Sequence, residues 1–191
     1  MTNELSVIHI PDLFKAVVSK VDEALFSRAV DPFHVYFDYG HVTEVTRNLT
    51  QKDLSISQKN KKYPLIWLVM DFEEEAGTID DNYCNLPALQ LFLCMPSRAE
   101  ISTDERMQLN FFPRLYPMYI ELLNQIDASG YFNLLNPLNI PHKRILRPYW
   151  DGKEGTGLSN YFNDFIDAIQ IRNLTLQVNE SVCDEFNILS P

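Results

Sequence analysis

The chain of 191 residues is long enough for one domain with a substantial core, but it is too short for two domains of ordinary size. With 46% hydrophobic and 12% aromatic residues it is too apolar to be disordered, and it has no apolar run approaching the roughly 20 residues that span a bilayer. Its formal net charge of -10 disfavours tight binding of nucleic acid, because counterion release requires clustered Lys and Arg.

The first predicted elements are a helix over residues 11–28 and a strand over residues 35–39. Pro11 suits the first helical turn, and the strand sequence VYFDY is rich in aromatic and β-branched residues and ends at Gly40. Apolar residues recur along the helix with a period of 3.6: Leu13, Phe14, Val17, Val18, Val21 and Leu25. This stripe must face a sheet or another helix.

Residues 40–63 are mostly polar and contain a basic cluster of Lys59, Lys61 and Lys62. We interpret this segment as a long loop or a hairpin. Loops of that length in compact domains are usually functional, or disordered until they bind a partner.

Two apolar runs predict a pair of adjacent antiparallel strands, 64–72 and 88–95. The first run, PLIWLVMDF, is almost continuously apolar, which is typical of a central strand buried on both faces. The loop between the strands is acidic and includes Asp71, Glu73, Glu74, Glu75, Asp80 and Asp81.

A second helix follows, for which Thr103 or Asp104 can provide the N-cap. Its apolar stripe contains Leu115, Tyr116, Tyr119, Leu122, Leu123 and Ile126. Pro113 and Pro117 force a kink or a fresh start inside it, and Gly130 ends it. A short strand is expected near residues 143–146, before the Gly-rich connector 151–157.

The segment 161–178 predicts one long closing strand whose register breaks once. Ile169 and Ile171 alternate with polar residues or alanine, and after an extra residue at Arg172-Asn173 the alternation resumes as Leu174, Leu176 and Val178. An inserted residue of this kind is a β-bulge.

Together these elements predict an α+β fold in a single domain, residues 1–178. We expect a mixed, mostly antiparallel sheet of about four strands, packed by two helices and connected by long loops. Residues 179–191 are expected to be a C-terminal extension, either loose or docked on a neighbouring chain.

No set of residues has the spacing of a catalytic or metal site. The histidines, His9, His34, His41 and His142, lie in unrelated segments, and the cysteines, Cys84, Cys94 and Cys183, lack metal spacing. The acidic run has no EF-hand spacing, and there is no phosphate loop and no G-x-S-x-G or S-x-x-K motif. The first residues do not form a secretory signal. We therefore expect no enzymatic activity, no cofactor and no bound metal.

Aromatic residues are abundant in the second half of the chain. Core packing accounts for most of them. Tyr149 and Trp150, however, border the Gly-rich connector together with Tyr161 and Phe162. Exposed aromatic residues beside polar ones are typical of subunit interfaces, so Tyr149 and Trp150 are candidate interface residues.

Five segments carry a resemblance to a known group of proteins. They are KKYPLIWLVMDFEEE (61–75), LPALQLFLCMPS (86–97), FFPRLYPMYIELLNQI (111–126), IPHKRILRPYW (140–150) and FNDFIDAIQI (162–171). In these segments the chain resembles small virion proteins of tailed phages of Bacteroidetes hosts, the crAss-like phages among them. The similar proteins are neck and tail components of the tail-terminator, tail-completion or connector-ring type. The first 60 residues are not covered by this resemblance.

The resemblance implies a structural protein that forms a homo-oligomeric ring between portal and tail and leaves an axial channel for DNA. It would reside in the virion, and in the host cytoplasm before assembly. Its partners would be other copies of itself, the portal and other neck or tail proteins, with DNA only in passage and no membrane. An acidic channel wall would let DNA slide without sticking.

The charge distribution suggests which residues form the interface. The basic cluster precedes strand 64–72 and the acidic run follows it, so the two signs lie at opposite ends of one element. Opposite-signed ends favour head-to-tail packing, which closes into rings when the rotation allows. The candidate interface is therefore Lys59, Lys61, Lys62, Asp71, Glu73, Glu74, Glu75, Asp80, Asp81, Tyr149 and Trp150.

Two alternatives remain open at this point. One is a metal-dependent enzyme that uses Asp71, Glu73 and Glu74, because hard cations need several oxygen ligands. The other is a cytoplasmic binding module of the adaptor or immunity type. Stabilisation by divalent ions would single out the enzyme, and the native mass would separate a ring from a monomeric adaptor.

Overall fold

Seven strands form one mixed sheet in the part of the chain that the computed structural model describes, residues 9–28, 31–76, 84–137, 139–146 and 164–179. They are β1 (Tyr36–Gly40), β2 (Leu65–Val69), β3 (Glu75–Ala76), β4 (Cys84–Pro96), β5 (Phe132–Leu134), β6 (His142–Leu146) and β7 (Ile166–Val178). The order is β1-β2-β4-β7-β5, with β3 beside β4 and β6 beside β7. Only β1 and β2 are parallel, and the other pairs are antiparallel.

The apolar strands β2 and β4 form the centre of the sheet, as predicted from their sequences. All five residues of β2 are buried, and Leu65 pairs with Cys94 in an antiparallel register. The indole Nε1 of Trp67 donates a hydrogen bond of 2.9 Å to the carbonyl oxygen of Gly40. A strand that is covered on both faces needs apolar residues on both, which explains the unbroken run.

The predicted bulge in the closing strand is confirmed. In β7, Ile171 pairs with Leu91 of β4 and Leu174 pairs with Leu89, so two residues of β7 lie opposite one of β4. Asn173 adopts a positive φ of 53°, which Asn tolerates better than most residues. Because of the extra residue, the apolar side chains before and after it point into the same core: Ile169, Ile171, Leu174, Leu176 and Val178.

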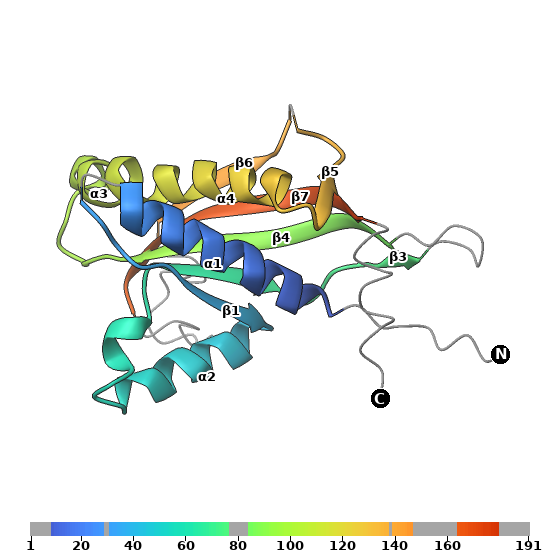
Figure 1. Cartoon of the computed structure of the whole chain (residues 1–191). Helices are drawn as coiled ribbons and strands as arrows, with labels where there is room; N and C mark the ends of the chain where they lie inside the picture. The colour runs from blue at the N-terminus through green and yellow to red at the C-terminus, as the bar shows by residue number, and fades with distance from the viewer. Residues whose placement is uncertain (1–8, 29–30, 77–83, 138, 147–163, 180–191) are drawn as a thin grey trace, which may run out of the picture.

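Helices cover both faces of the sheet (Figure 1). The predicted first helix is α1 (Ile10–Arg28), and it packs on one face beside α4 (Tyr116–Ala128). Helix α2 (Val42–Asp53) packs on the opposite face, over Trp67 and Phe92. We call these the α1/α4 face and the α2 face.

The interpretation of residues 40–63 as a loop or hairpin is wrong, because α2 and the 3-10 turn η1 (Lys59–Lys61) occupy most of this segment. Parallel strands such as β1 and β2 cannot be joined by a hairpin and need a crossover, usually a helix. The helix is held by a narrow apolar stripe with helical spacing, Val42, Val45 and Leu49, and all three side chains are buried.

The two prolines alter the second predicted helix as expected. A π-helical segment, η2 (Met107–Leu115), contains Pro113, and α4 starts at Tyr116 with Pro117 in its first turn. The cap is Ser102 rather than Thr103 or Asp104. Its hydroxyl accepts a hydrogen bond from the Glu105 amide while the Glu105 carboxylate accepts one from the Ser102 amide, which is a capping box for α3 (Thr103–Arg106). Gly130, with a φ of 72°, follows the end of α4.

The fold is therefore α+β with a mixed sheet, and the strand number and the number of longer helices, α1, α2 and α4, exceed the expected four and two. The short strand expected near 143–146 is β6. Of the predicted extension 179–191, only Asn179 lies within the described residues, and its amide donates to the carbonyl of Tyr131. Among the described helices, none is both long enough and apolar enough to cross a membrane.

Candidate interaction surfaces

The basic and acidic segments lie at opposite ends of β2. Lys59 and Lys61 are exposed in η1, just before the strand, and Asp71, Glu73, Glu74 and Glu75 are exposed just after it. Figure 1 shows β3, which begins with Glu75, at one end of the sheet and the turn between α2 and β2 at the other. The chain thus presents opposite charges at the two ends of strand β2.

Lys62, which the sequence analysis grouped with these exposed lysines, is instead buried within the chain. Its ammonium lies 2.7 Å from a carboxylate oxygen of Asp53 and 2.6 Å from one of Asp164. Burial by itself would lower the pKa of Lys62, but the hydrogen bonds to Asp164 and Asp53 raise that pKa above its ordinary value. Lys62 is therefore not available to a neighbouring chain, and only Lys59 and Lys61 of the basic cluster remain candidate interface residues.

Tyr63 joins the cluster that Lys62 forms with Asp53 and Asp164, which we call the Lys62 cluster. Its hydroxyl donates a hydrogen bond of 3.1 Å to Asp164, and both burial and the Asp164 charge raise the pKa of the phenol. A surface cavity of about 420 Å³ opens beside the cluster and is also lined by Lys59 and Ser97. The cluster thus connects the end of α2 with the residues that precede β7.

A second polar cluster surrounds the buried carboxylate of Asp167. Arg106 donates to Asp167 at 2.7 Å, and the side chains of both are at most 5% exposed. Asn110 donates to the other carboxylate oxygen of Asp167 at 2.7 Å, as does Ser97. Each member has a hydrogen-bond partner, so this cluster fixes α3 and η2 against the ends of β4 and β7 and offers no free group to a ligand.

Among the described strands, β1 forms one edge of the sheet, because it pairs only with β2. Tyr36 donates its amide to the carbonyl of Pro64 at 2.8 Å, so the backbone groups of Tyr36 and Asp38 face β2 and those of Phe37 and Tyr39 face away. Two of the outward amides are covered by carboxylates: Asp22 accepts from Val35 at 2.6 Å, and Asp38 accepts from Tyr39 at 3.0 Å.

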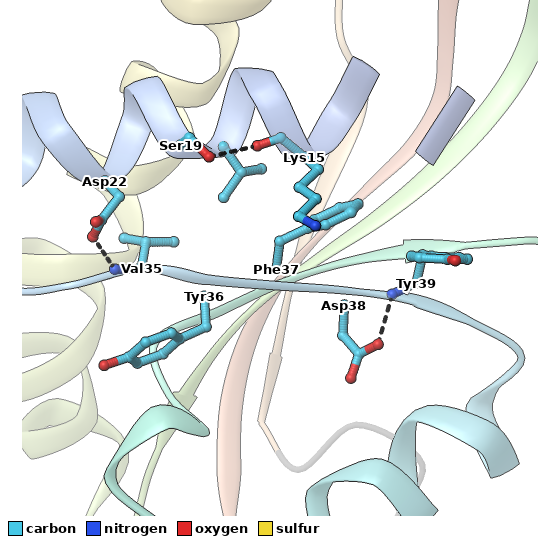
Figure 2. A pocket seen from close by; sticks show the side chains of 9 residues that line it. Lys15, Ser19, Asp22, Val35, Tyr36, Phe37, Asp38 and Tyr39 are labelled. Atoms are coloured by element: carbon cyan, nitrogen blue, oxygen red, sulfur yellow. Dashed lines mark hydrogen bonds between the residues drawn. The ribbon is translucent and has the colours of Figure 1, made fainter. Parts of the chain in front are cut away.

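A cavity of about 350 Å³ lies along this edge, between α1 and β1. Figure 2 shows Lys15, Ser19 and Asp22 of α1 facing the strand across it. Burial raises the pKa of Asp38, against the lowering effects of the Tyr39 amide and the Lys52 charge. A half-buried carboxylate that lacks a full ion pair favours an added positive charge.

Two strands, β5 and β6, form the opposite edge of the described sheet. The longer of them is β6, which pairs only with β7 among the described strands. Its side chains are mostly exposed, and it carries His142, Lys143 and Arg144 in succession. Residues 139–146 contain no acidic residue, so this edge is positively charged.

The residues considered for metal binding do not come together. Within the described residues no group of three or more His, Cys, Asp or Glu side chains could hold a metal ion. Each histidine has a local contact: His9 with Asp12, His34 with Asp22, His41 as the N-cap of α2 and His142 against the ring of Tyr119. Cys94 is buried, and burial raises the pKa of its thiol.

Four of the predicted interface residues, Asp80, Asp81, Tyr149 and Trp150, lie outside the described residues, as does Cys183. Sequence reasoning missed both open edges. The signal for one was present, because three consecutive basic residues, His142 to Arg144, in a short strand indicate an exposed edge.

No protein-family model matches this chain, and no curated protein is significantly similar to it.

Proposed function

We propose that this protein is a structural virion subunit that forms a homo-oligomeric ring in the neck or tail of a tailed phage. The ring joins the portal to the tail and leaves a channel through which DNA passes. The observation that carries the proposal is the exposure of opposite charges at the two ends of the strands, Lys59 and Lys61 at one end and Asp71 to Glu75 at the other. A subunit with opposite-signed ends favours head-to-tail contacts over symmetric ones.

The segments that resemble phage neck and tail proteins also support this function. They coincide with η1 and β2, β4, the helix pair η2 and α4, β6, and the first half of β7. The resemblance thus follows the strands β2, β4, β6 and β7 and one of the covering helices, α4.

The charge of the subunit suits a conduit for DNA. With a formal charge of -10, a ring of many copies repels phosphate groups from its inner wall, so DNA slides without being retained. The partners are other copies of this chain, the portal and adjacent neck or tail proteins, and the protein is in the host cytoplasm before it joins the virion.

Native mass spectrometry and electron microscopy of the purified full-length chain test the proposal. We expect closed assemblies whose mass is a whole multiple of the 22.2 kDa subunit, with a central hole in projection. Labelled protein added to assembling particles should be found at the junction of head and tail. A chain that stays monomeric at every concentration and never joins particles would contradict the proposed function.

A further inference from the structure

We propose that neighbouring copies join edge to edge, with β6 of one copy pairing antiparallel with β1 of the next, so that one continuous sheet runs around the assembly. The occupant of the β1 edge is therefore a second copy of this chain. This inference rests on the proposed ring for its closure, and it assigns the ring's lateral contact to strands that the sequence did not single out.

The direction of the strands makes this pairing antiparallel. β1 runs parallel to β2, β2 antiparallel to β4, β4 antiparallel to β7, and β7 antiparallel to β6. β1 and β6 therefore run in opposite directions at opposite edges of the sheet. When two copies lie side by side in the same orientation, these edges meet as an antiparallel pair, which is the more stable arrangement per residue.

The two edges also match in length and in their free backbone groups. β1 and β6 each contain five residues. The amide of Arg172 donates to the carbonyl of Pro141, and backbone groups alternate in direction along a strand. In β6 the backbone groups of His142, Arg144 and Leu146 therefore point away from β7. In β1 the outward groups are those of Phe37 and Tyr39. Each edge thus offers donors and acceptors to the other.

The faces of the sheet restrict which residues can be opposite. Phe37 packs into the core of the α1/α4 face, whereas Tyr36 packs against the core of the α2 face. In β6, Ile145 packs against the α2 face, while Arg144 reaches Met107 of η2. Because opposite residues share a face, Asp38 must lie opposite Lys143 or Ile145.

Electrostatics selects between these two registers. The first pairs each side chain with a complementary one: Asp38 with Lys143, Phe37 with Arg144, Tyr36 with Ile145 and Tyr39 with His142. It gives an ion pair, a cation–π contact, an apolar contact and an aromatic contact. The second register sets the Asp38 carboxylate against Ile145 and places Lys143 opposite Gly40. We therefore infer the first register.

The covered amides of β1 explain how this edge is protected before assembly. In the isolated chain the Asp38 carboxylate accepts a hydrogen bond from the Tyr39 amide. In the paired state the Tyr39 amide donates instead to the carbonyl of His142 in the next copy, and the Asp38 carboxylate is free to form an ion pair with Lys143. Covering of this kind reduces pairing with unrelated strands. The cavity between α1 and β1 lies along the edge where the added strand docks (Figure 2).

Like-with-like pairing is less favourable. An antiparallel β1 pair centred on Asp38 sets two carboxylates opposite each other, and a β6 pair centred on Lys143 or Arg144 sets two cations opposite each other. Like charges across a strand pair are destabilising. The unlike pair β6 with β1 is head-to-tail, so it propagates from copy to copy instead of closing at two.

Engineered disulfides test this register directly. In the proposed pairing the backbone groups of Asp38 face β2, so Asp38 and Lys143 form a non-hydrogen-bonded pair with Cα atoms about 4.5 Å apart, within the range that a disulfide bridges. We expect the Asp38→Cys, Lys143→Cys variant, with Cys183→Ser, to give a ladder of two, three and more linked chains on oxidation. The yield should exceed that of either single variant by at least tenfold, since a chain with one of the two cysteines has no partner thiol in register.

The matched control is Asp38→Cys with Arg144→Cys, whose side chains lie on opposite faces and should not link.

A charge exchange tests the same pair if the cysteine variants fail to fold. Asp38→Lys and Lys143→Asp should each weaken assembly about tenfold. The double exchange should restore assembly, because the ion pair is reversed rather than lost.

Each outcome decides the matter. Linkage in the double cysteine variant alone, or restoration by the double exchange, supports the pairing. A closed ring by native mass with neither effect overturns the edge-to-edge pairing and leaves the proposed function standing. Linkage of Asp38→Cys alone into two chains shows symmetric β1 pairing and overturns it as well. Monomers at every concentration contradict both proposals.

Discussion

The central strands and the edge strands β1 and β6 differ in polarity and in the exposure of their side chains. β2, β4 and β7 are largely apolar and enclosed, because each has strand neighbours on both sides and helices cover both faces of the sheet. β1 and β6 are short and carry charged side chains in half-exposed or exposed positions. The centre lets a single chain fold, and we propose that the edges pair with other copies of it. The predictions below test this division, from the largest expected effect to the smallest.

Deleting Asn173 should prevent folding, because it removes the bulge at the centre of the sheet. The deletion moves Leu174, Leu176 and Val178 to the opposite face of β7 and turns their side chains out of the core. We expect insoluble protein or a chain without a cooperative unfolding transition, measured by circular dichroism.

Deletion of Asn139, in the described segment between β5 and β6, is the matched control and should leave a folded chain. A deletion variant at Asn173 with the stability of the parent would show that the register of β7 tolerates slippage.

The next largest effect should come from the enclosed ion pair. Asp167→Ala leaves the Arg106 guanidinium buried without its carboxylate and removes the acceptor of Asn110 and Ser97. We expect a loss of about 3 to 5 kcal/mol in the free energy of unfolding, as is typical when one partner of a buried pair is removed. Urea unfolding measures it.

Asp127→Ala, at an exposed position near the end of α4, is the control and should change stability by less than about 0.5 kcal/mol. If the two variants were equally stable, the cluster would not contribute to holding η2 against the sheet.

These two predictions also show what could be derived from sequence. The bulge was predictable because alternation is local, and one extra residue at Arg172-Asn173 is visible in a single segment. The central pair β2 and β4 was predictable because unbroken apolar runs have few other places to lie.

Helix α2 was missed because only Val42, Val45 and Leu49 of its twelve residues are buried, and its polar composition resembles a loop. The parallel pairing of β1 with β2 requires a crossover helix between them. That pairing depends on contacts between distant residues, and no local sequence pattern reveals it. Strand number was underestimated for a related reason, since β3 and β5 are too short to show a period.

The interface residues show the same limit. Lys62 belongs to a run of three lysines, but its partner Asp164 is about one hundred residues away in sequence, so nothing near Lys62 indicates burial. Conversely, which strands form the edges of a sheet depends on the order of all of them. The charges of β6 were visible, and their place at an edge was not.

Lys62→Met should have an intermediate effect. The change removes the buried cation but leaves Asp53 and Asp164, whose side chains are 40% and 33% exposed and can be partly solvated. We expect a loss of about 1 to 3 kcal/mol near neutral pH, below the cost for a fully buried pair. Lys59→Met, three residues away and exposed, should be nearly neutral.

The pH dependence of this difference has a definite sign. The pKa of Lys62 is raised in the folded state, so its contribution is fully present below the ordinary value of 10.5 and is lost as the pH rises through the higher folded value. The gap between parent and Lys62→Met should therefore stay constant from pH 7 to about pH 10 and narrow above it. If the difference in unfolding free energy narrowed only as the pH falls, and not above about pH 10, the stabilising charge would not be that of Lys62.

The smallest effect on stability is expected at the end of the strands, where Lys59 and Lys61 remain in solvent. Reversing both to Glu while keeping Lys62 should change the free energy of unfolding by less than about 0.5 kcal/mol, because neither side chain has a partner among the described ion pairs. Assembly should nevertheless slow by about tenfold at low salt, and the difference should shrink as salt screens the charges. Light scattering at several ionic strengths measures the assembly rate and its dependence on salt.

Lys20→Glu with Arg47→Glu changes the net charge equally, but these residues lie on exposed surfaces of α1 and α2, so this double variant is the matched control. If the lateral contacts belong to the strand edges, the charged strand ends only orient the chains as they meet, so the Lys59 and Lys61 variant should still reach the ring mass of the parent, but more slowly. A variant that assembles as fast as the parent at low salt would show that these lysines face solvent in the assembled particle.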